Sequence, residues 1–189
     1  MLEPGARERL IGLLSETQLP LYGVFDAARD GRVLKLLAAS DTQSQCLYYG
    51  DKADKLARYA PYLVRLAPPV SDTLASLLTE GWGRSWGIYF LCKEPFERIR
   101  LHWKSLLYVR TEAGRRLYLR FYDPRVLHPF MDTCPPRNVA AFFGPVTKIV
   151  AECGNGEALI AYHPHADGMI HREKHLFSPG LGRPNNLQA

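Results

Sequence analysis

The chain of 189 residues lacks any apolar run approaching the roughly 18 residues that a membrane-spanning helix needs. Its opening, MLEPGARERL, also lacks the apolar segment of a secretory signal. These absences exclude an integral membrane protein and favour a cytoplasmic protein that does not bind membranes.

Cysteine is scarce, and its four copies lie far apart at positions 46, 92, 134 and 153. No C-x-x-C pair and no dense cysteine framework is present, which excludes the common zinc modules and disulfide-stapled folds. The chain contains neither a Walker loop nor a G-x-G-x-x-G fingerprint. We therefore expect reduced thiols, no metal and no cofactor.

Apolar residues make up 47% of the chain and charged residues 23%, proportions typical of a folded protein with a buried core. The net charge is +5, and the arginines gather between residues 98 and 125. Such basicity attracts nucleic acid, anionic lipid or an acidic protein partner, and it does not choose among them.

Short apolar runs alternate with amphipathic stretches along most of the sequence. Strands are expected at 19–26, 45–50, 62–66, 86–92, 147–153 and 157–163, a hairpin at 107–123, and helices at 4–16, 28–40, 51–61, 71–81, 95–107, 125–131 and 137–143. This alternation predicts an α/β fold with a mixed β-sheet flanked by helices. We expect a single compact domain over residues 1–162, followed by a flexible tail over 163–189 that is rich in histidine, glycine and proline.

Local signals predict several helix ends. Ser71 is expected to cap one helix, Gly81 to end it in a left-handed turn, and Asp123 to cap the helix that starts at Pro124. In the second strand of the 107–123 hairpin, leucine and phenylalanine alternate with Tyr118, Arg120 and Tyr122. That second face suits either a further packed layer or an exposed contact surface.

Residues 83–87 read Gly-Arg-Ser-Trp-Gly, which satisfies the G-x-S-x-G pattern of a serine hydrolase with Ser85 as its nucleophile. That enzyme class places the serine between a strand and a following helix, whereas here a helix precedes the motif and a strand follows it. Asp123 and His128 follow in the required chain order, so a hydrolase remains an alternative. The simpler interpretation is a tight glycine turn between Trp82 and Trp86, with tryptophan packed in the core.

Two further patterns are open to functional interpretation. Arginines and tyrosines interleave within residues 108–125, as in surfaces that stack bases, so a nucleic-acid-binding module is a second alternative. No helix-turn-helix, zinc module or complete ribonucleoprotein motif supports it. His163, His165, His171 and His175 fit no zinc module by their spacing, and we assign them to the tail.

Five stretches in matching order resemble one family over roughly residues 20–150. They are 21–37, 60–66, 81–90 (GWGRSWGIYF), 114–127 and 142–146. The sequence resembles the bacterial type VI secretion adaptor or effector-chaperone domain known as DUF4123. The resemblance implies a non-enzymatic, cytoplasmic protein that binds a toxic effector and helps to load it onto the VgrG spike.

An adaptor of this kind binds through exposed aromatic and arginine side chains, because these dominate the energies of protein interfaces. No catalytic residue is expected. The candidate partner-binding residues are Arg84, Trp86, Tyr118, Arg120, Tyr122 and Arg125.

Overall fold

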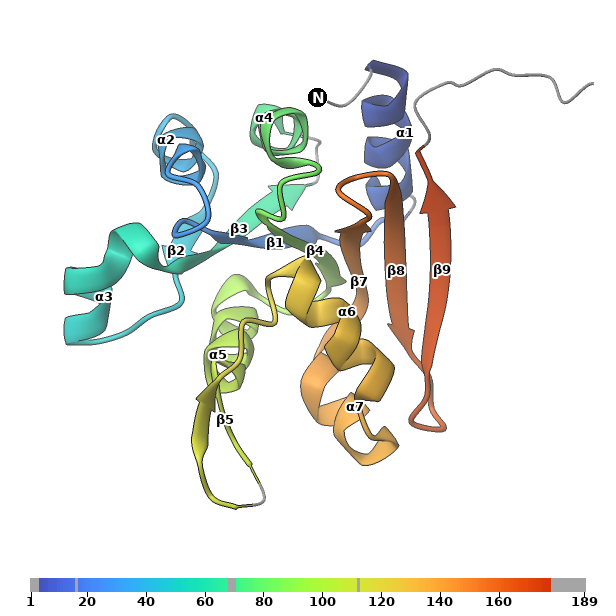
Figure 1. The fold of residues 1–189 in the computed structure, drawn as a ribbon. Helices are drawn as coiled ribbons and strands as arrows, with labels where there is room; N and C mark the ends of the chain where they lie inside the picture. The colour runs from blue at the N-terminus through green and yellow to red at the C-terminus, as the bar shows by residue number, and fades with distance from the viewer. Residues whose placement is uncertain (1–3, 16, 68–70, 112, 178–189) are drawn as a thin grey trace, which may run out of the picture.

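Seven strands form one sheet in a computed structural model, which describes residues 4–15, 17–67, 71–111 and 113–177 (Figure 1). The sheet order is β2-β3-β1-β4-β7-β8-β9. The strands are β1 (Leu21–Asp26), β2 (Ser44–Cys46), β3 (Pro61–Ala67), β4 (Gly87–Cys92), β7 (Val146–Cys153), β8 (Ala158–Pro164) and β9 (Ile170–Leu176). Strands β5 (Tyr108–Arg110) and β6 (Arg116–Tyr118) form a separate hairpin.

The α/β class is confirmed, but the expectation of a mixed sheet is wrong, because every pairing within the sheet is antiparallel. Strands β3 and β4 do run in the same direction, and helix α4 (Asp72–Gly81) crosses between them as expected. However, β1 lies between them and is antiparallel to both. The sequence could not reveal this inserted neighbour.

Helices cover both faces of the sheet. Helices α1 (Pro4–Ser15), α2 (Arg32–Ala38) and α4 lie on one side, and α5 (Phe96–Leu106), α6 (Pro124–Thr133) and α7 (Pro136–Phe143) lie on the other (Figure 1). Helix α3 (Asp51–Leu56) and a 3₁₀ turn (Ala57–Tyr59) precede β3. Among the described residues, no helix combines the length and apolar character needed to cross a bilayer.

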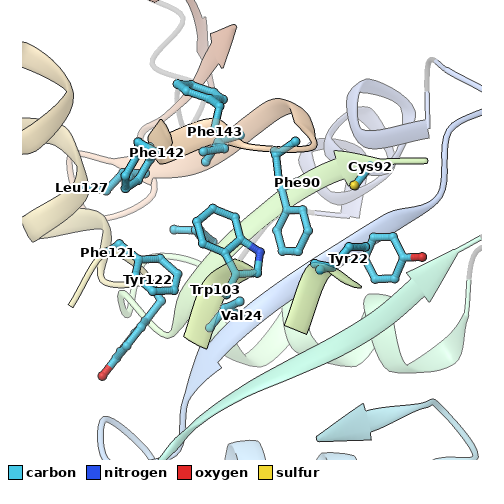
Figure 2. Close-up of a cluster of buried hydrophobic side chains, with 14 of the residues drawn as sticks. Tyr22, Val24, Phe90, Cys92, Trp103, Phe121, Tyr122, Leu127, Phe142 and Phe143 are labelled. Atoms are coloured by element: carbon cyan, nitrogen blue, oxygen red, sulfur yellow. The ribbon is translucent and has the colours of Figure 1, made fainter. Parts of the chain in front are cut away.

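The two faces of the sheet have separate cores because successive strand residues point to opposite sides. In β4, Ile88 and Phe90 join the core beneath α5, whereas Tyr89 joins the core beneath α4. At the centre of the first core, Trp103 stacks on Phe121 with ring centroids 4.6 Å apart and meets Phe90 edge-on (Figure 2). All of β4 is buried, as expected of a central strand.

The predicted helix caps are confirmed at two positions. The Ser71 hydroxyl accepts a hydrogen bond from the Leu74 N–H, and the Asp123 carboxylate accepts one from the Arg125 N–H. The prediction for Gly81 is wrong, because this residue ends α4 without a left-handed conformation. Its lack of a side chain instead makes room for the Trp86 ring, which lies 2.5 Å from where a Cβ would stand.

The expected long second strand of the hairpin is also wrong, because β6 ends at Tyr118. The Asp123 N–H donates to the Arg120 carbonyl (3.0 Å), so the chain turns before α6 and side chains no longer alternate. Phe121 and Tyr122 are therefore both buried, at 0% and 1% exposed, whereas Leu117 is exposed.

The flexible tail expected over residues 163–189, and with it the boundary at residue 162, is wrong for residues 163–177. These residues finish β8, turn, and return as β9, which pairs with β8 from Ile170 to Leu176. Strand β9 is the last strand of the sheet, and most of its side chains are exposed to solvent. Main-chain hydrogen bonds to β8 hold it in place, so its sequence does not need the alternating apolar residues that mark a buried strand. Residues 178–189 lie outside the described part of the chain.

Candidate functional site

Three segments that are distant in sequence meet at one end of the sheet. The Asp26 N–H at the end of β1 donates to the Trp86 carbonyl (2.7 Å), which joins β1 to the turn before β4. Arg29 Nε donates to the Arg84 carbonyl (3.1 Å). Arg120, from the segment before α6, lies 3.6 Å from Asp26 Oδ2. The structure thus brings together residues that the sequence placed on separate elements.

A single carboxylate holds the turn that contains the G-x-S-x-G pattern. Glu152 on β7 is 6% exposed, and its two oxygens accept the Gly83 N–H and the Ser85 N–H, each at 2.6 Å. Gly83 (φ 80°) and Ser85 (φ 55°) both have a left-handed backbone conformation. Their two N–H groups form a small concavity of the kind that binds anions, and the Glu152 carboxylate occupies it. Burial raises the pKa of Glu152, and the hydrogen bonds from Ser85 and Gly83 offset only part of that increase.

The glycines of this turn are required by close packing against other segments of the chain. A Cβ on Gly83 would lie 2.6 Å from the Asn155 carbonyl oxygen, and a Cβ on Gly87 would overlap the main chain of β1 at Val24. Trp82 Nε1 donates to the Gly156 carbonyl (2.8 Å) in the β7–β8 turn. The motif is therefore a tight turn between α4 and β4, as the turn interpretation expected. Its contacts with the β7–β8 hairpin were not expected from the sequence.

The residues of the hydrolase alternative bond elsewhere. Both ring nitrogens of His128 have partners, namely the Tyr162 hydroxyl (2.6 Å) and the Glu152 main-chain oxygen (2.7 Å). Asp123 caps α6 and pairs with Arg125. Ser85 donates its main-chain N–H to the Glu152 carboxylate. The Ser-His-Asp geometry that acyl transfer requires is not assembled among the described residues.

A chain of tyrosine hydroxyls lies beside this end of the sheet. The Tyr48 and Tyr118 hydroxyl oxygens are 3.0 Å apart, as are those of Tyr118 and Tyr122. Burial raises the pKa of Tyr122 to about 12, so its hydroxyl stays protonated and neutral. The charges of Asp26 and Arg120 both act on the Tyr122 hydroxyl, and Arg120 in turn pairs with Asp26.

Three arginines at this end of the sheet reach solvent, and we call Arg84, Arg120 and Arg125 the arginine patch. The side chains of Arg120 and Arg125 are 46% and 54% exposed, and Arg84 is exposed as well. Trp86 and Tyr122, in contrast, are 3% and 1% exposed, so both pack inside the chain. Tyr118 is partly exposed.

Buried carboxylates pair with two of these arginines. Arg125 donates to both oxygens of Asp123, through Nε (2.9 Å) and a terminal nitrogen (2.6 Å). Burial raises the pKa of Asp123, but the hydrogen bonds from Arg125 outweigh burial and hold that pKa below its usual value. At Asp26 burial is the larger effect, and it raises the pKa despite a main-chain hydrogen bond and the charge of Arg120.

Asp26, Glu152 and Tyr48 belong to this site, and the sequence analysis did not identify them. The available signal was a carboxylate within an apolar strand, since Asp26 ends LYGVFD and Glu152 interrupts VTKIVAEC. A charge in such a position is rarely buried without partners. No comparable signal marked Tyr48.

A family model described as "Domain of unknown function (DUF4123)" matches residues 21–141. The matched range includes the whole arginine patch but ends before Glu152. No curated protein matches the chain, and neither does any solved structure.

We expect Glu152→Ala to destabilise the domain by about 3 kcal/mol, because two amides lose their acceptor and each buried unsatisfied group costs about 1–3 kcal/mol. The matched variant, Ser85→Ala, keeps both amide hydrogen bonds and should cost less than about 1 kcal/mol. Urea unfolding followed by circular dichroism measures both values. Equal costs for the two variants would contradict the role assigned to the carboxylate.

Arg120→Gln is expected to raise the pKa of Asp26 further, because the guanidinium charge favours the ionised carboxylate. The folded-state pKa of Asp26 lies above its unfolded value, so its contribution to stability falls as pH rises from about 4 through the raised pKa. Carboxyl-carbon NMR titration gives the pKa directly. Arg84→Gln, at the same end of the sheet, should leave it unchanged, and an unshifted Asp26 in Arg120→Gln would refute the coupling.

Proposed function

Because the chain belongs to the DUF4123 family, we propose that it is a type VI secretion adaptor that binds a toxic effector and helps to load it onto the VgrG spike. The family match over residues 21–141 carries this proposal. In it the protein acts in the cytoplasm without catalysis, and protein–protein contacts supply its function.

The arginine patch supports a binding role because its side chains are partly fixed before a partner arrives. Asp123 holds Arg125, and Asp26 lies beside Arg120. Side chains that are already ordered lose less conformational entropy on binding, which strengthens an interface without new contacts. Arginine is also enriched among the residues that dominate interface energies.

A different interaction positions the backbone of Arg84. It lies between Gly83 and Ser85, whose amides both bind Glu152, so the clamped turn determines where its backbone stands. Arg84 therefore projects from a rigid support although its guanidinium is exposed. Trp86 and Tyr122 support the patch from within the core in this proposal, and Tyr118 forms its partly exposed border.

We expect the chain to co-purify with the candidate effector encoded beside its gene. Replacing Arg84, Arg120 and Arg125 together by alanine should weaken that complex at least about tenfold, because interface arginines commonly contribute more than 1 kcal/mol each. Isothermal titration calorimetry measures the affinities. The control replaces Arg58, Arg65 and Arg98, which are exposed elsewhere, and should change the affinity less than about twofold.

A second variant separates binding from stability. Arg84→Glu leaves the pairs at Asp26 and Asp123 intact, so it should fold normally and still weaken the complex. Failure of the effector to co-purify with the natural chain would refute the proposed function. Undiminished affinity in a folded Arg84→Glu variant and in the triple variant would refute the contact surface.

A further inference from the structure

A groove lies between α5 and the β5–β6 hairpin, outside the arginine patch, and has a volume of about 530 Å³. The hairpin projects from the body of the domain next to α5 (Figure 1). The residues that line the groove and bear on its chemistry are Tyr49, Leu101, Lys104, Tyr108, Arg110 and Arg116.

We propose that this groove binds an acidic segment of a partner protein, with an aromatic or large aliphatic side chain of that segment packed beside the carboxylates. The proposal rests on the proposed function, to which it adds a second contact surface and the chemistry of what occupies it. Charge, exposed apolar surface and the state of the tyrosine rings each support it.

The described lining of the groove is positively charged. Lys104, Arg110 and Arg116 line it, and no acidic residue does so in the described part of the chain. Arg110 and Arg116 are directly opposite each other in the β5–β6 pairing. Like charges in opposed positions of a hairpin repel each other. A carboxylate bound between the two guanidinium groups would remove that repulsion and accept their hydrogen bonds.

Part of the groove wall is apolar and exposed to solvent. Tyr49 is 62% exposed and Leu101 is 59% exposed, and both line the groove. An acidic segment without apolar side chains would leave this surface in water. A segment that combines acidic residues with an aromatic or aliphatic residue matches both parts of the groove.

The tyrosine rings favour a peptide over nucleic acid as the occupant. Lys104 Nζ lies 5.0 Å from the centroid of the Tyr49 ring, and Arg116 Cζ lies 3.9 Å from that of Tyr108. The rings of Tyr108 and Tyr118 also meet in an edge-to-face arrangement, with centroids 5.2 Å apart. Base stacking needs open ring faces, and these cations already occupy one face of each ring. The guanidinium groups remain well suited to carboxylates.

The test is a selection of random peptides of about twelve residues, displayed on phage, against the full chain. We expect the enriched peptides to be acidic and to contain an aromatic or large aliphatic residue. Synthetic copies of these peptides should bind the Arg110→Glu/Arg116→Glu variant at least about tenfold more weakly than the unmodified chain, because charge reversal turns attraction into repulsion. Fluorescence polarisation measures both affinities. The reversed pair keeps like charges opposed, so the hairpin is not selectively stabilised.

The matched control is Arg58→Glu/Arg65→Glu, which changes the net charge equally. Arg58 is also an exposed arginine stacked on a tyrosine, with Cζ 4.7 Å from the Tyr59 centroid. Affinity for the peptides should fall less than about twofold in this variant. A similar loss in both variants would show a general charge effect and overturn the assignment to the groove.

Other outcomes also overturn the proposal. The selection could enrich no peptides, or it could enrich neutral or basic ones. A labelled single-stranded oligothymidine could also bind the chain more tightly than the peptides do, and lose that binding in the Arg110→Glu/Arg116→Glu variant. The last result would assign the groove to nucleic acid. The peptide selection uses no effector, so its outcome is independent of the co-purification experiment. Failure of the groove proposal and failure of the proposed function can therefore be told apart.

Discussion

The hydrogen bonds from two main-chain amides to the buried carboxylate of Glu152 are the interaction on which this end of the sheet depends. They tie β7 to the turn between α4 and β4, and β4 and β7 are neighbours in the sheet. The turn contains two left-handed residues, one of them Ser85, a conformation that non-glycine residues adopt only at a cost. A carboxylate that satisfies both amides offsets that cost and fixes the backbone of Arg84.

Positive charge is arranged in two different ways on this chain. In the arginine patch, Arg120 and Arg125 stand beside the buried carboxylates of Asp26 and Asp123, which order the cations and balance their charge. In the groove, Arg110 and Arg116 face each other, and the described lining contributes no carboxylate. The first arrangement suits pre-ordered contacts at an interface, whereas the second favours a partner that brings its own negative charge.

Local chemistry was predictable from the sequence, and long-range pairing was not. The caps at Ser71 and Asp123 and the buried strand β4 follow from neighbouring residues, and all three were confirmed. The bonds from Gly83 and Ser85 to Glu152 span more than 60 positions, so no local pattern contains them. Strand β9 was missed because an exposed strand at the sheet margin needs no apolar repeat, and the mixed sheet was wrong because β1 inserts between β3 and β4.

Amide hydrogen exchange at Gly83 and Ser85 tests the central claim most directly, because these two N–H groups are the donors to Glu152. Exchange measured by NMR should be slow at both positions, comparable to the amides of β4, since opening the turn would expose a buried carboxylate. The account predicts that protection at both amides disappears together when the carboxylate is removed. Fast exchange at Gly83 and Ser85 in the natural chain, with β4 fully protected, would contradict it.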